Sequence, residues 1–214
     1  MDLHLGHELL LLHLDDGNGK GRLPEGPLAV AYGGAVLCQW RLDGQLVRKG
    51  PKAHVLETRG SRWASLRAAE AVVPEEPLSL VRLLDKIRGW RASNRYGPAL
   101  EELRAAGCVE PVKDTLLGMP WRTRWPERDG KVERALIRRL RTHMETVHED
   151  EPLSQDDALI AILAAVGLLD TVWTSTEVEL LASRIDSRAR LSAVARAVRS
   201  MVKVDRLLSG VPKL

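Results

Sequence analysis

Apolar residues recur at helical spacing along most of the chain. A first helix is predicted over residues 3–14, and the polar stretch 15–21 after it has the composition of a turn. A second helix is predicted from about 27 to 40, where Ala31, Gly33, Gly34 and Ala35 favour close packing against a neighbouring helix. Further helical segments are predicted near 61–73, 79–91, 98–107 and 130–147, and one or two amphipathic helices, separated near Asp186, over 176–208.

The most apolar helical segment begins after residue 154. Ser154 with Asp157 three positions later is a helix-start signature, and residues 158–169 are apolar almost all round, which is typical of a buried helix. Two β-prone pieces flank a Lys49–Gly50–Pro51 turn within 42–56, and residues 109–126 read as an irregular or hairpin segment. These patterns predict a mainly α protein, with residues 1–214 forming a single compact helical domain around one buried apolar helix, and one or two short β-hairpins.

Composition narrows the class of protein without indicating an activity. The chain has 214 residues, 44% hydrophobic and 29% charged, which excludes collagen-like, purely coiled-coil and disordered classes. Cys38 and Cys108 form no metal or disulfide pattern, so we expect a reducing, cytoplasmic setting. The N-terminus lacks the features of a signal peptide, and the apolar stretch 159–173 is too short to cross a bilayer.

The candidates for catalysis and metal binding are weak. Residues 17–22 are glycine-rich but have the wrong spacing for a phosphate-binding loop, and no serine sits in a nucleophile elbow. His4 and His7 would share a helix face near His13, but without a second ligand cluster we expect ordinary surface histidines. We therefore predict no enzyme, no metal and no cofactor. One enzymatic alternative is a hydrolase or transferase pocket joining Trp121, Arg122 and Trp125 to a histidine or carboxylate.

Basic residues are distributed unevenly, which the net charge of +3 conceals. Residues 82–95 carry five cations and one acid, Asp85. Arg88, Arg91 and Arg95 would share one helical face, although Gly89 and Ser93–Asn94 indicate that the helix ends near Arg91. Guanidinium groups pair with phosphates through charge-assisted hydrogen bonds, so Arg88, Arg91 and Arg95 are the predicted lipid- or anion-binding residues. The alternative is a solvated face whose arginines meet acids elsewhere.

Two other basic stretches carry less weight. Residues 122–141 include acids of their own, and the stripe Arg196, Arg199, Lys203 and Arg206 lies opposite apolar residues that would pack into the domain. The basic runs are interrupted by acids and aromatic residues are few, so nucleic-acid binding is not expected.

Several segments, read together, resemble the Golgi phosphoprotein 3 family and especially its bacterial members. They are ELLLLHLDDGNGKGR (8–22), YGGAVLCQWRLDGQL (32–46), ALEELRAAGCVEP (99–111), GMPWRTRWPERDGKVERALIRRLR (118–141) and DALIAILAAVGLLD (157–170). The resemblance implies a compact helical domain that binds phosphatidylinositol 4-phosphate at a membrane surface. It also implies an adaptor role for eukaryotic members, which retain glycosyltransferases in the Golgi, and a β-hairpin, at about 44–57 here, that assists membrane contact or oligomerisation.

The family's headgroup pocket is carried over only in part. Its aromatic residue falls at Pro24 and its first arginine at Gly33, so both are lost, whereas Arg91 and Arg95 lie at or near its later pair of arginines. We expect a non-catalytic, cytoplasmic, peripheral membrane protein that binds phosphoinositide or other anionic headgroups. The alternative is a protein-interaction or regulatory module of the same fold with a decayed lipid pocket. Self-association is left open.

Overall fold

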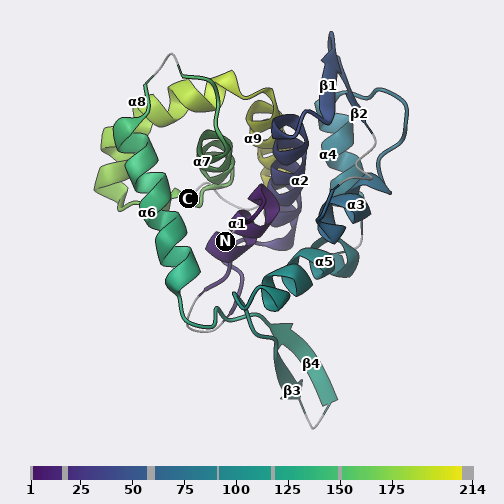
Figure 1. Cartoon of the computed structure of the whole chain (residues 1–214), viewed down its shortest axis with the longest axis vertical. Helices are drawn as coiled ribbons and strands as arrows, with labels where there is room; N and C mark the ends of the chain where they lie inside the picture. The colour runs from purple at the N-terminus through teal and green to yellow at the C-terminus, as the bar shows by residue number, and fades with distance from the viewer. Residues whose placement is uncertain are drawn as a thin grey trace.

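The computed structural model describes residues 2–15, 19–56, 61–90, 92–116, 119–148 and 151–208. Within these ranges the chain forms nine α-helices, one short 3-10 turn and two antiparallel hairpins (Figure 1). The predicted mainly α class with short hairpins is therefore confirmed. No helix in these ranges combines the length and the apolar character needed to cross a bilayer.

Two buried helices, α2 (Glu25–Leu42) and α7 (Gln155–Val166), form the centre of the fold. Ser154 caps α7 through the backbone N–H of Asp157, and the Asp157 carboxylate accepts the N–H of Ser154, as the helix-start signature predicted. Helices α1 (Leu5–His13) and α9 (Ala193–Leu208) pack against both of them. A Cβ on Gly34 of α2 would lie 2.4 Å from Cγ2 of Val198 on α9. The small residues of α2 thus permit the close helix contact predicted for them.

The outer helices surround this centre. They are α3 (Ala64–Glu70), α4 (Leu80–Gly89), α5 (Ala92–Ala105), α6 (Lys131–Thr146) and α8 (Ser175–Leu191), with the 3-10 turn η1 (Leu169–Thr171). Two boundaries differ from the sequence prediction. Helix α5 begins at Ala92, six residues before Pro98, so the proline lies inside the helix, where it removes one backbone hydrogen bond. The break between α8 and α9 falls at Ser192 rather than near Asp186, because the Ser192 hydroxyl caps α9 by accepting the N–H of Ala195 at 3.2 Å.

The two hairpins project at opposite ends of the molecule (Figure 1). Strand β1 (Leu46–Lys49) pairs with β2 (Lys52–Val55), and Ala53 also bridges Leu78 just before α4, so this hairpin lies beside the start of α4. Strands β3 (Val112–Leu116) and β4 (Met119–Arg124) form the second hairpin, with a register shift at Asp114/Thr115. The β-prone segment 42–56 therefore forms a hairpin, and the segment 109–126, predicted as irregular or a hairpin, contains the second.

Candidate functional site

The structure separates two of the three predicted anion-binding arginines, Arg88 and Arg95. Helix α4 ends at Gly89, its cap Trp90 has extended backbone angles, and α5 begins at Ala92. Arg88 is therefore in the last turn of α4 and Arg95 in the first turn of α5, so they do not share one helical face. Arg91 lies outside the described residues.

The Arg95 side chain is buried and holds the end of α4. Its Nε donates to the carbonyl of Ile87 at 3.2 Å, and its Nη2 donates to the carbonyls of Arg88 and Trp90. The last carbonyls of a helix have no partner within the helix, so a buried cation is a stabilising substitute. Arg95 therefore positions the segment that carries Arg88 and Arg91.

The carboxylate of Glu25 neutralises the positive charge of Arg95. Nη1 of Arg95 lies 2.6 Å from Oε1 of Glu25 and also donates to the Tyr96 hydroxyl at 2.9 Å. The Tyr96 hydroxyl in turn donates to Glu25 at 3.3 Å. The sequence predicted that Arg95 binds a phosphate. In the structure, Arg95 instead pairs with the carboxylate of Glu25 in the first turn of α2.

The two positions at which the family's pocket residues are lost also lie on α2. Pro24 is the N-cap of this helix and immediately precedes Glu25. Gly33 is buried, and a Cβ there would lie 3.3 Å from Leu84 and 3.5 Å from Ile87 of α4. An arginine at position 33 would have to displace these core side chains, so its loss is consistent with the close contact between α2 and α4.

Other cations of α4 remain at the surface. Arg82 and Lys86 are exposed and lie one helical turn apart, with the exposed Asp85 beside them. Within the described part of the chain, neither Arg82 nor Lys86 has a carboxylate within 4.0 Å. Arg82 and Lys86 outnumber Asp85, so this exposed side of α4 carries a net positive charge.

The basic stretch 122–141 is partly neutralised by acids. Arg124 donates to both carboxylate oxygens of Asp114, with Nη2 2.7 Å from Oδ1. Arg139 bridges Glu8 of α1 at 2.9 Å and Asp156 at 2.8 Å. These arginines connect elements of the fold. This agrees with the expectation that the stretch is a weaker candidate for anion binding than residues 82–95. The side chains of Trp121 and Arg122, named for the enzymatic alternative, lie outside those described.

The N-terminal histidines were expected at the surface, and that expectation is wrong. His4, His7 and His13 are all buried, because α1 is covered along its whole length. Nε2 of His7 lies 2.9 Å from Oε2 of Glu102, and Nε2 of His4 lies 2.9 Å from the Ser65 hydroxyl, which donates to the same Glu102 oxygen. The network connects α1, α3 and α5. Sequence reasoning missed Ser65 and Glu102 as its members because they lie 61 and 95 positions from their histidine partners.

This histidine cluster resembles a metal site in composition, but its hydrogen bonds do not. His4, His7 and Glu102 place three ligand atoms within 4.8 Å of one another. However, Nδ1 of His4 accepts the backbone N–H of Gly6 at 2.9 Å, so its proton is on Nε2, the atom that would have to bind the metal. A metal-bound histidine instead donates from its other ring nitrogen. Burial also lowers the pKa of His4 well below its ordinary value, so the ring is neutral and donates to Ser65. The arrangement fits a hydrogen-bond network that fastens three helices.

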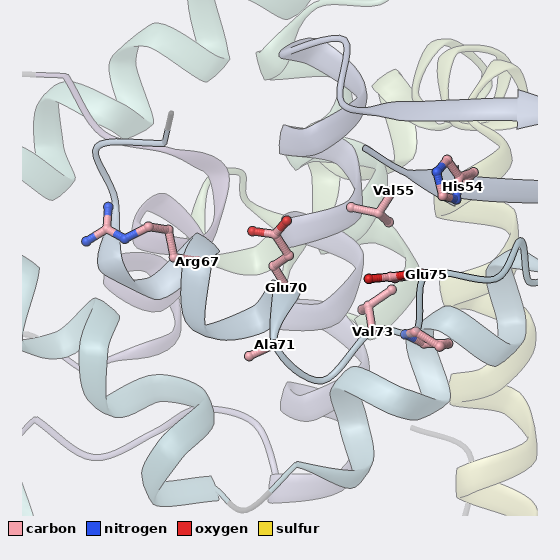
Figure 2. A pocket seen from close by; sticks show the side chains of 8 residues that line it. His54, Val55, Arg67, Glu70, Ala71, Val73 and Glu75 are labelled. Atoms are coloured by element: carbon pink, nitrogen blue, oxygen red, sulfur yellow. The ribbon is translucent and has the colours of Figure 1, made fainter. Parts of the chain in front are cut away.

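An open cavity of about 620 Å³ lies between β2, α3 and the loop after α3. Figure 2 shows the carboxylates of Glu70 and Glu75 beside this space, with His54 at one end and the Arg67 guanidinium directed away from it. Arg67 donates to the carbonyl of Ser61. Two carboxylates in the lining do not suit an anionic headgroup, so we do not place a lipid phosphate here.

Comparison with known protein families decides the affiliation. The Golgi phosphoprotein 3 (GPP34) family matches the chain over residues 5–204. The protein belongs to this family. The match includes α1, α2, α4, α5, α7 and both hairpins, so the elements around Arg95 and Glu25 lie within the family domain. A search of curated proteins finds no match for this GPP34 family member.

Proposed function

We propose that this GPP34 protein is a non-catalytic peripheral membrane protein that binds anionic phospholipid headgroups through the outer side of α4 and the turn that follows it. The observation that carries the proposal is the exposed pair Arg82 and Lys86, which has no carboxylate partner among the described residues. Arg88 and Arg91 extend the same stretch, and family membership supports a lipid-binding role. Arg95 contributes by fixing the end of α4.

The β1–β2 hairpin adds cations close to the start of α4. Lys49 and Lys52 face each other in the register of the hairpin, and both are exposed. Like charges directly opposite are unfavourable in a hairpin, but a nearby anionic surface relieves their repulsion. The bridge between Ala53 and Leu78 holds this hairpin beside α4, so both elements can approach one membrane surface.

The proposed mechanism is electrostatic. Each exposed cation near an anionic membrane contributes on the order of 1 kcal/mol, and the attraction decays within a Debye length of about 8 Å at physiological salt. Within this class of ligand, a phosphatidylinositol 4-phosphate-like headgroup is the finer proposal, since a guanidinium such as that of Arg82 forms charge-assisted hydrogen bonds with a phosphate monoester. Binding should fall steeply as salt is raised.

Vesicle sedimentation tests this proposal. Phosphatidylcholine vesicles containing phosphatidylserine or phosphatidylinositol 4-phosphate are compared with pure phosphatidylcholine at low and high salt. The double variant Arg82→Ser/Lys86→Ser should weaken binding by about tenfold or more, because two cations are lost. The matched control is Arg104→Ser/Lys131→Ser, which removes two exposed cations already paired with Glu101 and Asp129. Equal binding by both double variants, or no binding to anionic vesicles at low salt, contradicts the proposal.

The Glu25–Arg95 ion pair favours a second candidate function. In this alternative the fold is kept as a protein-interaction or regulatory module, because the arginine that could bind a phosphate is already satisfied by Glu25. A partner protein captured equally well from membrane-free and membrane-containing extracts, with no vesicle binding, selects this alternative. Loss of capture when membranes are removed selects lipid binding.

A further inference from the structure

A second cavity, of about 380 Å³, lies between the end of α7, helix α8 and helix α9. It is distant in sequence from the α4 surface and is not part of the site discussed above. Small side chains create the space: Ala164 and Ala165 near the end of α7, and Ala182 in the middle of α8. Volumes of a few hundred Å³ are typical of sites for small organic ligands.

The cavity is open to solvent, and its α8 side is mainly aliphatic. Val178, Ala182 and Ile185 stand at i, i+4 and i+7 and therefore line it from one face of α8. Val202 of α9 and Leu169 of η1 complete the lining, and Ile185 and Val202 are almost fully buried. A ligand that fills the space must present an apolar surface to it.

The α9 side of the cavity is cationic. Arg199 and Lys203 are one helical turn apart on α9, and both line the cavity. Asp186 of α8 also lines it and lies 3.3 Å from Arg199, so this acid neutralises one of the two charges. Lys203 is exposed and has no carboxylate within ion-pair distance among the described residues. One net positive charge therefore remains beside the aliphatic α8 side of the cavity.

We propose that this cavity binds a single-chain anionic amphiphile, with the alkyl chain against the α8 face and the anionic head on Lys203 and Arg199. The class includes a fatty-acid carboxylate and a lysophospholipid phosphate. Charge complementarity selects this occupant over a neutral or cationic one, because an apolar body with one anionic end matches both parts of the lining. The inference is independent of vesicle binding by α4, since it concerns a single monomeric molecule held in a cavity at the surface between α8 and α9.

Calorimetric titration of the whole chain with dodecanoate, kept below its micelle concentration, tests the proposal. We expect saturable binding at one site, at least about fivefold tighter than for dodecyltrimethylammonium, which has the same chain with a cationic head. A parallel titration with a lysophosphatidic acid of the same chain length shows whether a phosphate head is preferred to a carboxylate. No saturable binding of either anion, or equal affinity for the cationic amphiphile, overturns the proposal.

Two variants locate the ligand in this cavity. Lys203→Ser should weaken dodecanoate binding by about fivefold and leave binding of uncharged decanol unchanged, because only the head loses its partner. Ala182→Leu should weaken binding of both ligands, because the added side chain occupies the cavity. Lys131→Ser, which removes an exposed lysine of α6 that is paired with Asp129, is the control and should bind dodecanoate as the wild type does. If Ala182→Leu is poorly folded by circular dichroism, Lys203→Ser against Lys131→Ser decides the outcome alone, and equal affinities for the two contradict the proposal.

Discussion

Nη1 of Arg95 lies 2.6 Å from Oε1 of Glu25, across 70 positions of sequence. The arginine is buried whereas the carboxylate is half exposed, with 57% of its side chain accessible. The pair fastens the first turn of α2 to the junction between α4 and α5. It also places a negative charge close to the cations proposed to meet the membrane, so Glu25 opposes anion binding there.

Removal of this negative charge should strengthen membrane binding. In Glu25→Gln the amide oxygen can still accept a hydrogen bond from Arg95, but the local charge rises by one. We expect affinity for phosphatidylserine vesicles to increase about fivefold at low salt and the increase to disappear at high salt. Glu75→Gln, an exposed acid beside the 620 Å³ cavity, serves as control. If both variants bind alike, Glu25 does not influence the site.

Arg95 should matter more for stability than the exposed arginines of α4. Arg95→Ala leaves the carbonyls of Ile87, Arg88 and Trp90 without this donor, and unsatisfied buried polar groups are costly. We expect the free energy of unfolding to fall by about 2–3 kcal/mol in urea titrations. Arg82→Ala should change it by less than about 0.5 kcal/mol. Similar losses for the two variants would contradict a positioning role for Arg95.

Mild acid should destabilise the fold through its buried histidines. Burial, and to a lesser extent Arg22, lowers the pKa of His13 from 6.5 to about 4, and its Nδ1 accepts the N–H of Leu23 at 3.2 Å. Burial also lowers the pKa of His4. The unfolded chain therefore binds protons near pH 6.5 that the native chain does not, so stability present above this pH is lost as pH falls towards 4.

Urea unfolding at pH 7 and pH 5 measures this effect. Each such histidine should account for roughly 2 kcal/mol of lost stability between the two values. His13→Asn keeps an acceptor for the N–H of Leu23 but cannot titrate, so it should remove roughly half of the pH dependence. Glu8, whose pKa is raised by burial, acts in the opposite direction from its ordinary value of 4.5 up to the raised value, so it offsets part of the loss close to pH 5. A wild-type protein as stable at pH 5 as at pH 7 would contradict lowered pKa values for His4 and His13.

Stability measurements below pH 5 test the contribution of Asp157. Burial by itself would raise the pKa of Asp157, but hydrogen bonds from Arg188, the Ser154 N–H and His143 outweigh it and hold the pKa well below its ordinary value of 3.8. The stability that this carboxylate supplies is therefore present above pH 3.8 and is lost as pH falls further. Asp157→Asn should be less stable than wild type at pH 6, with a smaller difference at pH 3. A difference that grows towards pH 3 would show the opposite linkage.

The contact between α2 and α9 should tolerate no methyl group at position 34. A Cβ there would lie 2.4 Å from Cγ2 of Val198, a β-branched side chain with little rotamer freedom. Gly34→Ala should lower the free energy of unfolding by about 1–3 kcal/mol, as overpacked cores do. Gly89→Ala, where nothing lies within 4 Å, should instead be neutral or stabilising by up to about 1 kcal/mol. Thermal unfolding should show a lower melting temperature for Gly34→Ala and an equal or higher one for Gly89→Ala. Equal shifts of the melting temperature would contradict the close approach of α2 and α9 at Gly34.

The sequence by itself determined the elements of this protein. Helical periodicity marked most of the helices, the Ser154–Asp157 signature predicted the start of the buried helix α7, and turn residues predicted the β1–β2 hairpin. These features depend on residues close together in the chain, so their physical causes can be read locally. The family resemblance came from the same local segments and is confirmed over residues 5–204.

Only the tertiary structure decided what the polar side chains do. Arg95 was predicted as a phosphate ligand, yet it meets Glu25 and the carbonyls at the end of α4. His4 and His7 were expected at the surface, yet they are buried against Ser65 and Glu102. A charged or titratable group takes the partner that the packed fold brings within hydrogen-bond distance. That partner lies tens of residues away along the chain, where sequence periodicity carries no information about it.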